Sequence, residues 1–220
     1  MLGSARAWPG QTETVFVAEE ETTEMSSTVT LQRKRPVVLA DLVAGSALRD
    51  AALVVGAAGL VGLLAQFSIH LSFTPVPVTG QTLGVLLAGS ALGWKRGSAA
   101  MALYLAAGVA GLPWFADHSS GYVGASFGYL IGFVLCALAC GYLAERGADR
   151  SLLKSIPAMV AGELVMYGAG VVWLALDLHV GAQKAISLGL TPFIVGDALK
   201  AAIAAGLLPA AWKLAGRTGR

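Results

Sequence analysis

Residues 51–94 read AALVVGAAGLVGLLAQFSIHLSFTPVPVTGQTLGVLLAGSALGW, a stretch that contains no Asp, Glu, Lys or Arg. A membrane-spanning helix needs about 20 consecutive apolar residues, so this run is long enough for two spans. Over the whole chain 56% of the residues are hydrophobic and 13% are charged, against about 25% charged in ordinary soluble domains. Long apolar runs without strand-like alternation argue against a membrane barrel. The sequence therefore predicts an all-α integral membrane protein.

The rest of the chain extends this pattern to six expected transmembrane helices. We place them near residues 48–71, 79–93, 97–112, 126–144, 157–176 and 192–214. Lys and Arg gather before the first helix, between the second and third, between the fourth and fifth, and after the sixth, whereas the alternate loops hold only Lys184. Because basic residues favour the cytoplasmic side, this asymmetry predicts that both termini are cytoplasmic.

Residues 1–35 differ in composition from everything that follows. They are rich in Thr, Glu and Ser and contain too little apolar surface to offset the entropy of ordering. We therefore expect a flexible polar tail at 1–35 and a membrane domain at 36–220. Met25 lies between an acidic run and the basic flank of the first helix, and we hypothesise that it is the true start. The net charge of +2 gives no reason to expect a nucleic-acid partner.

The last apolar segment contains a carboxylate and an ammonium, in Thr191-Pro-Phe-Ile-Val-Gly-Asp-Ala-Leu-Lys200. Residues three apart share a helix face, so Asp197 and Lys200 can point in one direction. Ionisable groups in a membrane usually face a bundle interior or a cavity and mark a solute path. We interpret the pair as a functional site, with a structural ion pair as the alternative.

Other polar residues of the apolar segments are weaker candidates. Glu163 lies either at the cytoplasmic end of the fifth helix or reaches inward towards Lys200. Tyr129, Tyr167 and Trp173 combine an apolar body with a polar tip, so they are candidates for lining a pocket. Such residues also anchor helices at membrane interfaces, which is the alternative interpretation.

Small residues recur along the first helix, where Ala47, Ala51, Ala52 and Gly56 form a stripe. Small residues at such spacing let helices approach closely in lipid. The stripe serves either internal packing or the docking of another membrane protein.

Signatures of catalysis and metal binding are absent or weak. The sequence contains no Gly-x-x-x-x-Gly-Lys-Ser/Thr, so the chain has no P-loop for ATP hydrolysis. Cys136 and Cys140 lack the paired arrangement of a zinc site and are interpreted as buried packing residues. A metal would need more ligands than the histidines supply, which are His70, His118 and His179. Adjacent His118-Ser119-Ser120 seldom gives triad geometry and no Gly-x-Ser-x-Gly elbow occurs, so neither a metal nor catalytic residues are expected.

Four motifs follow one another in an order that is typical of one family. They are Phe73-Thr-Pro-Val-Pro-Val-Thr-Gly-Gln-Thr-Leu-Gly-Val-Leu-Leu-Ala-Gly89, Gly111-Leu-Pro-Trp-Phe-Ala116, Gly128-Tyr-Leu-Ile-Gly-Phe133 and the Thr191 to Lys200 segment quoted above. Together they resemble BioY, the biotin-binding S-component of energy-coupling-factor transporters. Gly124-Ala-Ser-Phe-Gly-Tyr129 departs from the family's Gly-Pro-Thr-Gly-Gly-Tyr, so the family's loop shape is not transferred to Ser126 and Phe127.

The resemblance implies a six-helix subunit that captures biotin from outside and delivers it with a transmembrane coupling protein and two ABC-type ATPases. It implies a multi-pass protein in the plasma membrane of a prokaryotic-type cell, without a cofactor. Asp197 and Lys200 match the family's final motif and are implied as ligand contacts. The stripe of Ala47, Ala51 and Ala52 resembles the motif by which S-components dock on the coupling protein. Further expected contacts are Thr79, Gln81, Gly128, Tyr129 and Tyr167.

Biotin combines an apolar ring and chain with a ureido group and a carboxylate, so its site needs an apolar enclosure with a few fixed polar groups. Lys200 can attract the carboxylate or bond the ureido oxygen, and Asp197 can accept ureido N–H groups or orient Lys200. An S-component for a different small vitamin is the alternative within the class. A membrane enzyme that uses His118 and the loop serines, and a structural membrane protein without a ligand, are the alternatives from other classes.

Overall fold

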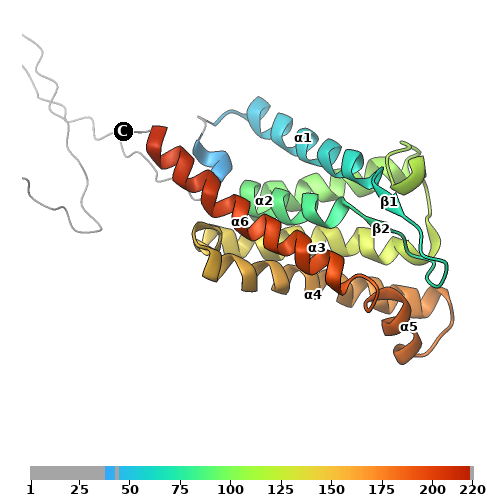
Figure 1. Ribbon diagram of the computed structural model, residues 1–220. Helices are drawn as coiled ribbons and strands as arrows, with labels where there is room; N and C mark the ends of the chain where they lie inside the picture. Colours follow the sequence, from blue (N-terminus) through green and yellow to red (C-terminus); the bar gives the residue numbers. More distant parts are fainter. Residues whose placement is uncertain (1–37, 43–44, 219–220) are drawn as a thin grey trace, which may run out of the picture. The chain divides into compact units, whose positions relative to one another are not determined.

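The computed structural model describes residues 38–42 and 45–218, and the structural statements below refer to those residues. Contacts divide the chain into two units, Met1–Arg35 and Pro36–Arg220, and every described residue belongs to the second. The expected tail at 1–35 and the hypothesis about Met25 lie outside the described residues. The elements, with short 3₁₀ helices labelled η, are η1 (Leu39–Leu42), α1 (Ala47–Ala65), β1 (Ser68–Ile69), β2 (Val78–Thr79), α2 (Gln81–Val109), η2 (Ala116–His118), η3 (Gly124–Ser126), α3 (Phe127–Glu145), η4 (Ala148–Arg150), α4 (Leu152–Asp177), α5 (Ala182–Gly189) and α6 (Ile194–Thr218) (Figure 1).

The long helices pack side by side in the membrane domain. α3 lies between α2 and α4, α1 packs on α2, and α6 contacts both α2 and α4 (Figure 1). Within the described residues, four helices are long and apolar enough to cross a membrane, namely Ala47–Ala65, Gly124–Glu145, Leu152–Asp177 and Ile194–Gly216. The structure therefore agrees with the predicted class, a mostly helical membrane protein.

α2 reverses direction at Gly93, where φ is 82° and ψ is 171°. Beyond this residue, a Cβ on Gly97 would lie 2.8 Å from Cα of Gly89. Residues eight apart along a straight helix are separated by about 12 Å, so the two halves of α2 form a tight antiparallel pair. The sequence predicted a break here with residues 94–96 as its connection, whereas the structure makes the turn at one residue. Only glycine adopts this positive φ without strain.

The Glu145 side chain stabilises the reversal of α2. Its Oε1 accepts a hydrogen bond from the backbone N–H of Trp94 at 3.2 Å, so the first free donor of the second half is satisfied. The same Oε1 lies 2.6 Å from the position that a Cβ on Gly93 would take, so a side chain there would displace the Glu145 carboxylate.

The first helix is shorter than predicted, because α1 ends at Ala65 instead of near residue 71. The Gln66 side chain donates to the Gly62 carbonyl at 2.9 Å and so occupies a helix acceptor at this end. The chain then forms a short hairpin in which Ser68 pairs with Thr79 and Ile69 with Val78. This antiparallel pair was not predicted, and it brings Thr79 back towards the end of α1.

The later helices match the predicted ones with two differences. α4 begins at Leu152 and not at Pro157, because Ser151 O already accepts from Ser155 N at 2.9 Å and the first turn forms before the proline. α5, eight residues long, was not predicted and lies between α4 and α6. A helix this short could not be distinguished from a loop in the sequence, because hydrophobic periodicity can be recognised only over several helical turns.

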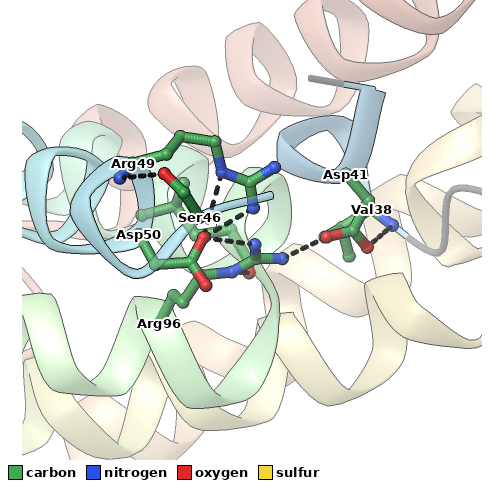
Figure 2. Close-up of polar contacts among 7 residues, drawn as sticks. Val38, Asp41, Ser46, Arg49, Asp50 and Arg96 are labelled. Atoms are coloured by element: carbon green, nitrogen blue, oxygen red, sulfur yellow. Dashed lines mark hydrogen bonds and ion pairs between the residues drawn. The ribbon is translucent and has the colours of Figure 1, made fainter. Parts of the chain in front are cut away.

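A charged cluster ties η1 and the start of α1 to the Gly93 reversal (Figure 2). Arg96 donates from Nη2 to Asp41 Oδ1 at 2.6 Å and from Nη1 to Asp50 Oδ1 at 3.1 Å. Arg49 also donates from Nη2 to Asp50 Oδ1, at 2.5 Å. One guanidinium thus holds two elements beside the turn of α2, and we call Asp41, Arg49, Asp50 and Arg96 the Arg96 cluster.

Candidate functional site

A cavity of about 340 Å³ lies among α2, α3, α4, α6 and the loops at one end of the domain. Ligand pockets have volumes of roughly 300–1,000 Å³, so this one suits a small molecule. Its apolar lining residues are Val76, Pro77, Phe115, Ala116, Val123, Leu130, Phe133, Met166 and Phe193. Its polar lining residues are His70, Thr79, Gln81, Thr82, Asp117, Ser119, Ser120, Tyr122, Ser126, Tyr129, Tyr167, Asp197 and Lys200.

The predicted ion pair forms the most buried charged part of this cavity. Lys200 Nζ lies 2.7 Å from Asp197 Oδ1, and Asp197 is 3% exposed. Lys200 Nζ also donates to the backbone carbonyl of Thr79 at 2.5 Å. An ion pair away from water is stable only when further hydrogen bonds satisfy both partners. The pair therefore requires the polar neighbours that the fold supplies.

Asp197 receives two more hydrogen bonds, from different helices. The Thr82 hydroxyl of α2 donates to Oδ1 at 3.0 Å, and the Tyr167 hydroxyl of α4 donates to Oδ2 in a short bond. Asp197 lies in the first turn of α6, where the positive end of the helix dipole also favours a carboxylate. Residues of three helices thus meet at one carboxylate, and both of its oxygens accept hydrogen bonds.

Most of the predicted ligand residues come together in the cavity. They are Thr79, Gln81, Tyr129, Tyr167, Asp197 and Lys200. The Tyr129 hydroxyl donates to the Gly189 carbonyl at 2.6 Å, which fixes that ring against the end of α5. Gly128 does not line the cavity, because a Cβ on it would lie 2.1 Å from Cβ of Trp173, so it packs α3 against α4.

Trp173, a candidate lining residue, also lies outside the cavity lining. Its ring is 5.4 Å from that of Phe127, and its Nε1 donates to the Gly124 carbonyl at 3.3 Å. Trp173 therefore supports the loop that carries Ser126 and does not itself face the cavity.

Thr82 and Phe115 are among the cavity residues that sequence reasoning missed. Thr82 is buried and bonds Asp197, a residue 115 positions away, and its place in the Phe73 to Gly89 motif was the signal that could have found it. Phe115 is 1% exposed and lines the cavity. It lies within the Gly111 to Ala116 motif, which likewise could have found it.

Glu163 is buried, with 8% exposure, well inside the 26-residue helix α4. It therefore does not lie at the end of its helix, as one of the two interpretations expected. Its Oε1 has no hydrogen-bond partner among the described residues, and it does not line the cavity.

The hydrogen bonds of Ser68, Ser119 and His70 do not join a serine to a histidine. Ser119 donates to the Ala116 carbonyl at 2.6 Å, and Ser68 donates to Asp117 Oδ1 at 2.5 Å. His70 contacts the other oxygen of Asp117, at 3.0 Å, so the carboxylate separates the serine from the imidazole. A serine nucleophile needs its base within hydrogen-bond reach. Within the described ranges, no three His, Cys, Asp or Glu side chains are grouped to hold a metal ion.

Comparison with known proteins places this chain in a family. The model of the BioY family matches residues 30–217. A protein of Rhizobium etli named biotin transporter BioY is 36% identical over 155 residues, which cover 66% of this chain and 81% of that protein. A protein of Thermotoga maritima with the same name is 39% identical over 140 residues, which cover 62% of this chain and 81% of that protein.

A solved structure shares the fold. It is the 2.1 Å crystal structure of the S-component for biotin from an ECF-type ABC transporter, and it superposes with a TM-score of 0.69 at 23% sequence identity. The match covers 76% of this chain and 92% of that one. Since the family model spans nearly all of the membrane domain and the fold agrees with it, the chain belongs to the BioY family.

Proposed function

We propose that this chain is the substrate-capture subunit for biotin of an ECF-type transporter. The observation that carries the proposal is the buried Asp197–Lys200 pair, held by Thr82, Tyr167 and Thr79 in a cavity with apolar walls. Two relatives, each matched over 81% of its length, carry the name biotin transporter BioY.

The cavity offers what biotin chemistry requires. Phe115, Phe133 and Phe193 give apolar walls for the ring and chain, while the buried polar groups supply donors and acceptors. The site contains a cation beside its carboxylate, so Lys200 can bond either the ureido oxygen or the ligand carboxylate. Biotin amide, which keeps the ureido group and lacks the negative charge, distinguishes the two poses. If Lys200 bonds the carboxylate, the amide binds much more weakly than biotin.

The same proposal assigns six membrane segments to the domain. They are α1, the two halves of α2, α3, α4 and α6, with both termini in the cytoplasm and the cavity at the outer side. The basic residues near the Gly93 turn and between α3 and α4 support this orientation. The site then lies in the plasma membrane and faces the medium from which biotin is taken.

Energy would come from partners, a transmembrane coupling protein and two ABC-type ATPases, since the chain has no P-loop. Ala47, Ala51 and Ala52 are exposed on α1, and a Cβ on Gly56 would meet nothing within 4 Å. This free face of small residues supports docking in preference to internal packing.

Calorimetry on the purified protein in detergent tests the proposal directly. We expect stoichiometric binding of biotin and no heat from other vitamins in a panel at the same concentrations. Binding of another vitamin in place of biotin would support the alternative substrate, and the absence of any binding would overturn the proposed function. We expect no turnover of bound biotin.

A further inference from the structure

Tyr104 lies outside the cavity but is hydrogen-bonded to a residue that lines it. Its side chain is 0% exposed, in the second half of α2. Its hydroxyl oxygen is 2.7 Å from Gln81 Nε2 and 3.2 Å from the Trp114 carbonyl. A carbonyl only accepts and a tyrosine hydroxyl has one proton, so that proton goes to Trp114. The hydroxyl therefore offers Gln81 only an acceptor.

This arrangement fixes the Gln81 side-chain amide at both ends. Its NH₂ group must face Tyr104, because only the nitrogen can donate to the hydroxyl. Its Oε1 accepts from the Thr79 hydroxyl at 2.8 Å. Gln81 is 5% exposed and lines the cavity, with one N–H and one lone pair uncommitted to these two bonds. The backbone carbonyl of Thr79 is meanwhile held by Lys200.

We propose that Tyr104 is a positioning residue whose buried hydroxyl sets the orientation of the Gln81 amide, so that the site presents a fixed donor and a fixed acceptor to a neutral urea or amide group. The assignment rests on the proposed function for its ligand. A rotation of the amide by half a turn would exchange donor and acceptor, and a buried group facing the wrong partner loses its hydrogen bond. Tyr104 thereby acts on binding without touching the ligand.

The surrounding contacts allow this role to be isolated by one substitution. In Tyr104→Phe the ring remains, so its contacts with Trp114 at 5.1 Å and Phe115 at 5.3 Å are kept. The Trp114 carbonyl keeps a donor, Gln66 Nε2, at 3.2 Å. Trp114 Nε1 still donates to the backbone carbonyl of residue 104, at 2.9 Å. In this variant, therefore, only the Gln81 NH₂ group loses a hydrogen-bond partner, the Tyr104 hydroxyl, without another named group to replace it.

A double-mutant cycle on the full chain provides the first test. We expect Tyr104→Phe to weaken biotin binding about five- to tenfold by calorimetry, as expected for one lost hydrogen bond. In a Gln81→Ala background the same substitution should have no further effect, because the group that it orients is absent. Tyr142→Phe, at a 48% exposed position on α3, is the matched control and should leave affinity unchanged. Equal losses of affinity in both backgrounds would overturn the proposal.

Side-chain amide NMR of ¹⁵N-glutamine-labelled protein without ligand provides the second test. The Gln81 NH₂ signals, identified by their loss in Gln81→Ala, should be resolved and slow to exchange with solvent. In Tyr104→Phe they should shift and exchange faster, and in Tyr142→Phe they should not change. Unchanged signals in Tyr104→Phe would overturn the proposal. If the wild-type protein binds no biotin, the proposed function fails, and the NMR result still decides whether Tyr104 orients Gln81.

Discussion

The Arg96 cluster and the Asp197–Lys200 pair place charges in the same domain in different ways. Arg96 bridges carboxylates of η1 and α1, and the side chains of Asp41 and Asp50 are 31% and 46% exposed. The Lys200 and Asp197 side chains are 16% and 5% exposed, and their other partners are neutral hydroxyls and a carbonyl. In the cluster, a planar guanidinium joins two elements by bonding a carboxylate on each. In the pair, the remaining hydrogen bonds are to neutral groups, and a ligand can take the place of these groups. We therefore expect mutations in the pair to weaken both stability and binding, and mutations in the cluster to weaken stability alone.

Lys200→Ala should have the largest effect of all. It leaves the buried Asp197 carboxylate without its cation, and breaking such a pair costs about 3 kcal/mol of the free energy of unfolding. Biotin binding should weaken at least about tenfold, or ~1.4 kcal/mol, because the ammonium is a proposed ligand contact. Thermal unfolding and calorimetry measure the two effects, with the exposed Lys213→Ala as control. Unchanged affinity would remove Lys200 from the site.

Asp197→Asn added to Lys200→Ala should separate structure from binding. The second substitution removes the uncompensated charge, so we expect it to recover about 2 kcal/mol of the lost stability. Affinity for biotin should stay low, because neither charged contact is restored. A double variant that regains both stability and binding would show that the pair serves packing alone.

The charged pair could be predicted from sequence because ionisable residues are costly in apolar segments and these two share a helix face. Thr79, Gln81 and Tyr129 could be chosen because their motifs flank the predicted outer loops, and the structure places all three at the cavity. The roles of Thr82, which follows Gln81 in the same motif, and of Tyr104 could not be predicted, since they depend on partners 115 and 23 positions away. The identity of a single threonine or tyrosine does not indicate which distant group it will contact in the folded protein.

For the fold as well, the helices could be predicted from the sequence, whereas the Gly93 turn and the β1–β2 pair could not. Hydropathy located the helices to within a few residues at most ends. The single-residue turn at Gly93 escaped prediction because a positive φ leaves no mark in the hydropathy pattern, and the chain has 28 glycines. The β1–β2 pair escaped because two-residue strands are too short to show alternation.

Arg96→Ala should lower stability without changing binding, in contrast to Lys200→Ala. Loss of the bridge to Asp41 and Asp50 should cost about 1–2 kcal/mol, less than the buried pair because these groups are partly exposed. Arg96→Lys should restore little, because an ammonium cannot reach both carboxylates with the fork geometry of a guanidinium. Unfolding at low and high salt, with biotin titrations alongside, measures both effects. A weakened biotin affinity would contradict the separation of the two regions.

Asp149→Asn should have the smallest effect, and a stabilising one. Asp149 is 1% exposed in the loop between α3 and α4, and accepts one hydrogen bond, from Trp212 Nε1 at 2.6 Å. Its Oδ1 has no hydrogen-bond partner among the described residues. Burial raises the pKa of this carboxyl above its ordinary value of 3.8, although the Trp212 hydrogen bond opposes the shift. The protein thus holds a carboxylate whose ionised form is poorly compensated.

The sign of the pH dependence follows from that shift. A carboxyl whose pKa is raised on folding binds its proton more tightly in the folded state, so stability falls as pH rises from about 3.8 through the folded pKa. At neutral pH the asparagine variant avoids this cost, and its unfolding midpoint should lie about 2–4 °C higher. The difference should shrink in acid. A lower midpoint at neutral pH would mean that the ionised carboxylate is compensated after all.

The reversal at Gly93 also leaves a short helix in the interior of the domain. Residues 81–92 form a helix of only about 18 Å at ~1.5 Å per residue, whereas the hydrocarbon core of a bilayer is about 30 Å thick. Most of these residues are buried by the neighbouring helices. In the six-segment arrangement proposed above, protein and not lipid would therefore surround this half of α2, and the exposed ends of its backbone would be satisfied by protein groups such as Glu145.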